Sequence, residues 1–277
     1  MARYKLTLAY DGTDFFGSQR QAKRRTAQGE LEMALRGLGW TDRSALLSGR
    51  TASGVHATGQ VAACNLDWAH TDDELVRALN AKLPGDISVW DAKIVRDDFH
   101  PRFDAISRTY SYQLFCDALR NPIRERFAWR VNHALDDDLL KQASQTILGA
   151  HDFSSFGSPT TPKGTTMRTV KKAEWIRVEK DQWRFEVEAD AFLYRMVRRL
   201  VFAQVAAGQG KLHVDAIAES LARQAGNRKR SALRSGLAPA HDRRTREPAH
   251  PHHDVDEQRR LRYAALPLAD SDQPHFH

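Results

Sequence analysis

The sequence predicts an α+β protein made of two similar α/β subdomains, each with a mainly antiparallel sheet. Strand-like and helix-like segments alternate in both halves of the chain. The 277 residues suffice for one large core, or for two modest cores that share a sheet. We therefore divide the chain into an N-terminal subdomain, 1–104, a C-terminal subdomain, 105–241, and an atypical tail, 242–277. The two halves show no sequence repeat.

The N-terminal half opens with a half-buried strand. Polar and apolar residues alternate over 3–10, which places the side chains of Tyr4, Leu6, Leu8 and Tyr10 on one face. Apolar residues at helical spacing then predict a helix over 26–38, with Thr26 as its N-cap. The other elements expected in this half are a strand at 60–66, a helix opened by the capping box Thr71–Glu74, and a strand at 87–95.

The C-terminal half follows a similar order. The patterns predict a strand at 106–116, a helix at 139–148, a hairpin of 169–178 and 183–189, and a helix pair at 193–207 and 214–224 broken at 208–210. The tail differs because it lacks apolar periodicity and is rich in proline and histidine. We expect it to be disordered, an interpretation favoured over a metal site at His250, His252 and His253.

Composition and charge narrow the functional classes. A hydrophobic fraction of 41% and a charged fraction of 28% suit a soluble globular protein, and the sequence has no apolar run of membrane-spanning length. Neither cysteine has metal-ligand spacing, so we expect Cys64 and Cys116 to be buried, inert thiols in the reducing cytoplasm. The net charge of +7 and the grouped arginines and lysines are consistent with a polyanionic partner, and equally with solvated faces.

A glycine-rich segment at 47–61 carries the densest set of polar side chains. Three glycines fall in these fifteen residues, with arginine, threonine, serine, histidine and glutamine between them. Glycine permits positive φ and close backbone approach, so the segment is typical of a bent loop that presents polar groups. A simple connecting turn has the same composition, and the loop alone does not indicate a chemistry.

The string G-R-T-A-S-G-V-H-A at 49–57 resembles G-R-T-D-x-G-V-H-A, the signature of the TruA-type tRNA pseudouridine synthases. Eight further motifs match that family in the same order along residues 3–240. They are Y-D-G-T at 10–13, Q-R-Q at 19–21, T-x-Q-G-E-L-E at 26–32, L-P-G-D-I at 83–87, F-H-x-R-F at 99–103, R-T-Y-x-Y at 108–112, and H-D-F-x-S-F at 151–156 with F-x-x-x-M-V-R at 192–198.

The resemblance implies a fold and a reaction. Two α/β subdomains would flank a central RNA-binding cleft, and a homodimer would bind tRNA across both subunits. Such enzymes isomerise uridine to pseudouridine at positions 38 to 40 of the tRNA anticodon stem-loop, with no metal and no organic cofactor. The uracil is detached from C1′, turned and rejoined through C5, so the target must leave the base stack. An aspartate acts as the nucleophile.

The same resemblance assigns roles to individual residues. Arg50 corresponds to the arginine that pairs with the nucleophile, and Tyr110 to the tyrosine that packs on the base. Arg198, Gln19, Arg20 and His56 correspond to substrate-binding positions, although His56 also suits a brace for the loop. The nucleophile's own position is Ala52, whose methyl group can neither attack carbon nor accept a proton.

This substitution leaves two functional classes open. The chain is either a tRNA pseudouridine synthase or a catalytically inactive tRNA-binding homologue or variant. Rescue by Ser53, Asp11 or Asp14 is disfavoured, because serine needs a base and both aspartates belong to a neighbouring motif. A general single-strand RNA module is a third interpretation, which predicts no preference for tRNA.

This chain also departs from the family pattern at two other places. Residue 18 is serine, where the family usually has tryptophan, and the sequence after His241 does not follow the family, so we hypothesise a change of reading frame there.

Overall fold

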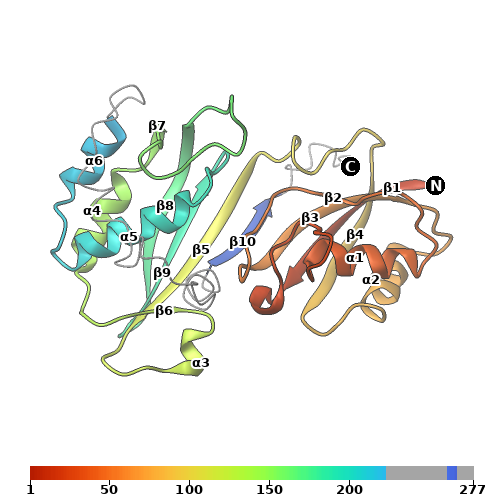
Figure 1. Ribbon diagram of the computed structural model, residues 1–277, viewed down its shortest axis with the longest axis horizontal. Coiled ribbons are helices and arrows are strands. Elements are labelled where there is room, and N and C mark those ends of the chain that lie inside the picture. The colour runs from red at the N-terminus through yellow and green to blue at the C-terminus, as the bar shows by residue number, and fades with distance from the viewer. Residues whose placement is uncertain (223–260, 267–277) are drawn as a thin grey trace, which may run out of the picture. The chain divides into compact units, whose positions relative to one another are not determined.

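The computed structural model describes residues 1–222 and 261–266, which form two compact units. The first contains Met1–Arg108 and a strand near the C-terminus, and the second begins at Thr109. Each unit combines an antiparallel-rich sheet with helices (Figure 1), so the predicted α+β class is confirmed. None of the helices in the described ranges has the length and apolar character needed to cross a membrane.

The sheet of the first unit has the strand order β4-β1-β3-β10. Its central strand β1 (Ala2–Tyr10) pairs antiparallel with β3 (His56–Leu66) and with β4 (Ile87–Val95). The short β2 (Leu46–Leu47) is antiparallel to β3. Strand β10 (Leu261–Leu266) runs parallel to the first residues of β3.

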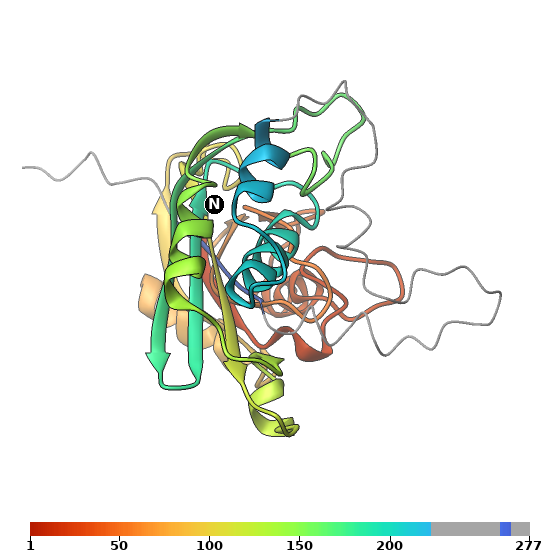
Figure 2. The same ribbon diagram turned by 90° about the vertical axis from the view of Figure 1, so that its left-hand side faces the viewer.

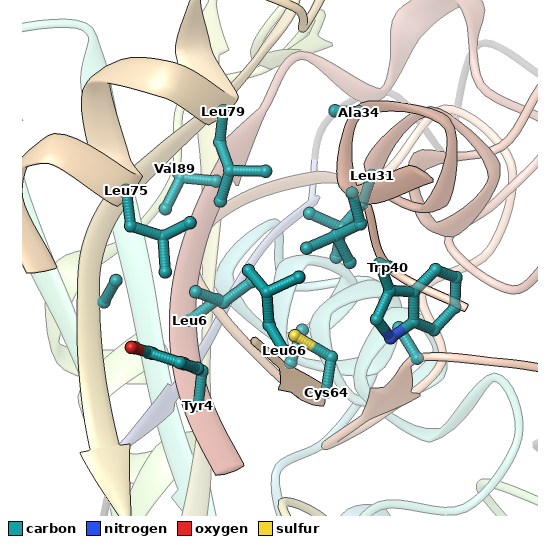
Figure 3. Close-up of a cluster of buried hydrophobic side chains, with 14 of the residues drawn as sticks. Tyr4, Leu6, Leu31, Ala34, Trp40, Cys64, Leu66, Leu75, Leu79 and Val89 are labelled. Carbon is teal, nitrogen blue, oxygen red and sulfur yellow. The ribbon is translucent and has the colours of Figure 1, made fainter. Parts of the chain in front are cut away.

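Two helices bury one face of this sheet. The N-cap Thr26 accepts a hydrogen bond from Gly29 N at the start of α1 (Ala27–Arg36), as predicted. The predicted capping box of Thr71 and Glu74 opens α2 (Asp72–Asn80). Leucines of both helices pack with Tyr4 and Leu6 of β1 in one apolar cluster (Figure 3). This core fixes the sheet from which the glycine-rich loop and the 3-10 turn η1 (Gly12–Asp14) project.

The second unit has the strand order β5-β9-β8-β7, with β6 beside β5. Its strands are β5 (Ser107–Cys116), β6 (Trp129–Val131), β7 (Gly149–Asp152), β8 (Met167–Glu179) and β9 (Gln182–Ala189), and its helices are α3 (Pro122–Glu125), α4 (Asp137–Gln145), α5 (Met196–Gly208) and α6 (Asp215–Ala222). The long β8–β9 hairpin is visible in Figure 2 and confirms the predicted pair of strands. Helix α4 packs against β8 and α5.

The starts of two elements differ from the predictions. β3 begins at His56 rather than residue 60, because Ala57 pairs with Tyr10 despite the nearby glycines. Helix α5 begins at Met196 rather than residue 193, since Tyr194 N donates to Ser158 O at 2.9 Å and Arg195 has a φ of 64°. Its end at Gly208 agrees with the predicted break, after which Gly210 has a φ of 67°.

Two further expectations need correction. Six residues of the predicted disordered tail form β10, because their backbone pairs with the edge of β3; the remainder of 242–277 lies outside the described residues. Cys64 is buried as expected, and burial raises the pKa of its thiol to about 12. Cys116 is only half-buried, so the expectation of a second buried thiol is wrong.

Candidate active-site loop

The loop between β2 and β3 is held at Thr51. Its backbone N–H donates to Ser18 Oγ at 2.8 Å, and its carbonyl accepts from Ser18 N at 3.1 Å. Its hydroxyl shares a 2.9 Å hydrogen bond with the Tyr10 hydroxyl. Ser18 is fully buried, so the position where the family has tryptophan here supplies a small polar side chain that clamps the loop. The backbone directly before residue 52 is therefore fixed.

The loop is also held on the other side of residue 52. Phe15 O accepts from Gly54 N and from Ser53 Oγ, each at 3.2 Å. Val55 N donates to Ala52 O at 3.2 Å, which closes a turn with a φ of 75° at Gly54. The Ser53 hydroxyl is therefore a hydrogen-bond donor to a main-chain carbonyl.

Ala52 and Arg50 are both exposed on this loop. Within residues 1–222, Arg50 has no acidic partner at ion-pair distance and makes no side-chain hydrogen bond. Asp11 Oδ1 instead lies 3.0 Å from His56 Nδ1 and accepts from Thr13 N and Oγ1. The loop thus presents an exposed guanidinium at Arg50, which suits an anionic ligand, and a methyl group at Ala52, which cannot act as a nucleophile.

His56 is buried beneath the loop. Its Nδ1 accepts a hydrogen bond from Gly12 N at 3.2 Å, and Gly12 lies so close to the loop that a Cβ there would be 2.1 Å from Val55 O. With an exposed fraction of 5%, the imidazole is enclosed by protein. This geometry supports the interpretation of His56 as a brace for the loop.

Gln19 and Arg20 follow Ser18 on the same segment, and both are exposed. Arg20 Nη1 donates to Glu32 Oε2 at 2.5 Å, and Arg20 N donates to Gln28 Oε1 at 2.8 Å. Glu32 is fully buried on α1, and the Arg20 guanidinium is the nearer of its two arginine partners, since Arg36 Nη2 lies 3.9 Å from the same oxygen. Arg20 therefore anchors the segment, and its predicted contact with substrate stays a prediction.

The remaining predicted residues lie in the second unit. Tyr110 on β5 is half-buried and packs edge-to-face against Phe192, with 4.9 Å between ring centroids. Arg198 lies in the first turn of α5 and is also half-buried. Their place in a cleft shared with Arg50 stays a prediction.

The family model described as tRNA pseudouridine synthase matches residues 7–104 and 143–244, which together exceed half of the chain. The chain belongs to the tRNA pseudouridine synthase family. The resemblance stated from its motifs is confirmed.

Two relatives show how far this membership extends. A tRNA pseudouridine synthase A from Methylacidiphilum infernorum is 41% identical over 211 residues, covering 76% of this chain and 82% of that protein. Another from Chloroflexus aurantiacus is 39% identical over 247 residues, covering 87% and 86%. A solved archaeal box H/ACA sRNP Nop10–Cbf5 complex matches with a TM-score of 0.35 at 11% identity, over 74% of this chain and 43% of that one.

One residue that supports the signature loop, Arg108, was not predicted from the sequence. Arg108 Nη2 donates to Ser48 O at 3.2 Å and to Arg102 O at 2.9 Å, which ties the loop before Arg50 to the segment before β5. The motif R-T-Y contained Arg108, but its contact with Ser48 joins residues 60 positions apart in the chain. Pattern spacing does not reveal such a long-range main-chain contact.

Gly17 gives the first testable prediction for this member of the family. It has a φ of 91°, and a Cβ there would lie 2.8 Å from Thr51 O. Gly17→Ala is expected to lower the free energy of unfolding by roughly 3 kcal/mol, because backbone strain adds to a main-chain clash. Gly39→Ala is the matched control, since Gly39 has a φ of 90° and open space around it. Equal losses for both variants in urea unfolding would contradict the proposed contact.

A second prediction concerns Asp86, which accepts two hydrogen bonds from the Arg25 guanidinium at 2.6 and 2.8 Å. This pairing holds the pKa of Asp86 below its ordinary value of 3.8. The pair therefore stabilises the fold fully above that pH, and the contribution is lost as pH falls through the lowered folded-state pKa. Asp86→Asn is expected to cost up to about 1 kcal/mol at pH 7, because solvent screens the partly exposed pair.

The difference between the parent chain and Asp86→Asn should shrink in unfolding experiments as the pH is lowered below about 4. Asp98→Asn provides the control, since Asp98 is 82% exposed in its ion pair with Arg96. A difference that stayed constant down to pH 2 would contradict the assignment to Asp86.

Proposed function

We propose that the function carried by this fold is tRNA pseudouridine synthesis at positions 38 to 40 of the anticodon stem-loop. Membership of the family, together with the folded and tightly anchored signature loop, carries the proposal. The net charge of +7 suits a polyanionic substrate. A homodimer in the cytoplasm is the further expectation from the resemblance, and the free state of both cysteines is consistent with a reducing compartment.

The loop supports distinct roles for its side chains in this proposal. Arg50 is exposed, so its guanidinium can bind a phosphate or face the charge that develops on the flipped nucleotide. His56 and Arg20 hold the main chain around it through contacts with Gly12 and Glu32. Tyr110 offers an aromatic face for the base, as the family resemblance implies.

A second candidate function is favoured by one observation: residue 52 is alanine. Bond cleavage at C1′ needs an attacking group, and the neighbouring Ser53 hydroxyl donates to Phe15 O instead of facing a base. Asp11 Oδ1 accepts hydrogen bonds from Thr13 N and Oγ1 and lies 3.0 Å from His56 Nδ1. This candidate is a tRNA-binding homologue that does not catalyse the reaction.

Pseudouridine formation in an anticodon stem-loop separates the two candidates. Product formed by the unchanged chain supports the synthase, whereas product formed only after Ala52→Asp supports the inactive homologue. Binding to the stem-loop and to an unstructured RNA of equal length is measured in parallel. Equal affinity for both RNAs would contradict tRNA recognition and favour a general single-strand RNA module.

A further inference from the structure

An aromatic ring and an arginine form an exposed pair beside the active-site loop. Phe16 is 46% exposed, and Arg24 Cζ lies 4.4 Å from the centroid of its ring. Arg24 and the adjacent Lys23 are both exposed. A guanidinium over a ring presents a planar, positively charged surface of the kind on which nucleic-acid bases stack.

The main chain that carries this pair is held in place. Phe16 N donates to Arg25 O at 2.9 Å, and the Gln21 side chain donates to Phe16 O at 2.6 Å. Residues 21 and 24 form a β-bridge, so the segment folds back on itself. Arg25 is in turn fixed by Asp86. The exposed ring is therefore presented by a well-supported turn, and little ordering is needed before a ligand binds.

Phe16 also lies between two residues that touch the loop at position 52. On one side, Phe15 O accepts hydrogen bonds from Ser53 and Gly54. On the other, a Cβ built on Gly17 would be 3.5 Å from the carbonyl carbon of Ala52 and 3.5 Å from Ser53 N. The Phe16 ring therefore belongs to a segment whose main chain lies against the loop at residues 52 to 54.

We propose that Phe16 and Arg24 form a stacking subsite for an unpaired RNA base close in sequence to the uridine that enters the active site. Extrusion of one base from a loop leaves its neighbours unstacked, and an aromatic or guanidinium plane compensates for the lost stacking. Lys23 adds charge for the adjoining phosphate. This inference rests on the proposed function and adds to it a second contact to the RNA.

Exposure alone does not distinguish this pair, since single exposed aromatic residues are common on protein surfaces. Trp90 on β4 is 59% exposed, yet no cation covers its ring among the described residues. Arg36 lies over Trp40, but that ring is buried. Phe16 combines an accessible ring, a stacked guanidinium and a place beside residue 52. Trp90 and Arg36 therefore supply matched controls.

The test is a coupling experiment on RNA binding by the full chain. Affinities for an anticodon stem-loop are measured for the parent, Phe16→Ala, Phe16→Leu and Arg24→Lys, with Trp90→Leu and Arg36→Lys as controls. Each variant is also measured with a series of stem-loops in which one loop nucleotide at a time is abasic. Phe16→Leu preserves apolar volume and Arg24→Lys preserves charge, so both isolate stacking. Thermal unfolding verifies that the variants are folded.

We expect both Phe16 variants to bind the intact stem-loop about tenfold more weakly than the parent, with the controls unchanged. One abasic position should weaken the parent about tenfold and leave Phe16→Ala unaffected, since the contact is already absent. Parent-like affinity of the Phe16 variants, or identical abasic profiles, overturns the subsite while leaving the proposed function intact. A parent that does not prefer the stem-loop to unstructured RNA overturns both.

Discussion

Ala52→Asp is expected to form pseudouridine far faster than the unchanged chain, because it restores the carboxylate of the family signature at residue 52. Loss of a catalytic nucleophile can lower kcat on the order of 10⁶-fold, so restoration should be unmistakable. Ala52 is exposed, and its main chain lies in a turn closed by Val55 N, so a carboxylate can be added without displacing buried neighbours. The exposed Arg50 lies two residues earlier and supplies an opposite charge. Product is measured in anticodon stem-loop RNA under single-turnover conditions.

Two variants of the same loop isolate the carboxylate. Ala52→Asn has nearly the same shape without the charge, and Ser53→Asp places a carboxylate one residue further on, where the native hydroxyl donates to Phe15 O. Neither variant should show the gain in rate expected of Ala52→Asp. Binding of the stem-loop should be similar in all four proteins, because residue 52 acts on the reaction more than on the phosphate contacts. Turnover by the unchanged chain would show that another group replaces the aspartate.

The elements with local signals were predicted well. Thr26 and the Thr71–Glu74 box cap their helices as expected, because a capping side chain contacts a backbone N–H only two or three residues away. The alternation at Tyr4 and Leu6 correctly identified the buried face of β1. Family motifs located the signature loop, although they did not indicate how Ser18 and Thr51 hold it.

The parts that the sequence left undetermined depend on long-range pairing. β10 has no partner near it in the chain, and its pairing with β3 joins residues 262 and 56. Arg20 was interpreted as a substrate contact, but it also neutralises Glu32, twelve residues away and fully buried. A charge count does not separate arginines paired within the fold from those available to a ligand, and this distinction determines how much of the net charge can bind RNA.

Binding of the anticodon stem-loop is expected to weaken about a thousandfold between 50 and 200 mM salt, if some six phosphates are contacted. Within the cluster 20–25, Arg20 is paired with Glu32, and Arg25 with Asp86 and Glu30. Lys23 and Arg24 are the exposed cations of that cluster: Lys23 is available to a phosphate, and the Arg24 guanidinium can stack on a base while its charge offsets an adjoining phosphate. Because each released counterion contributes to the slope of log affinity against log salt, Lys23→Gln with Arg24→Gln should reduce that slope by about two.

A paired lysine provides the control for this experiment. Lys172 Nζ lies 2.5 Å from Glu174 and 3.0 Å from Glu186, so its charge is already compensated within the protein. Lys172→Gln should therefore leave both the affinity and the slope unchanged, although it removes the same formal charge as either substitution in the cluster. If Lys172→Gln reduced the slope as much as a change at Lys23, binding would follow total charge and not a defined phosphate-contacting surface. A slope that differs between the two sites instead localises the RNA to the turn beside residue 52.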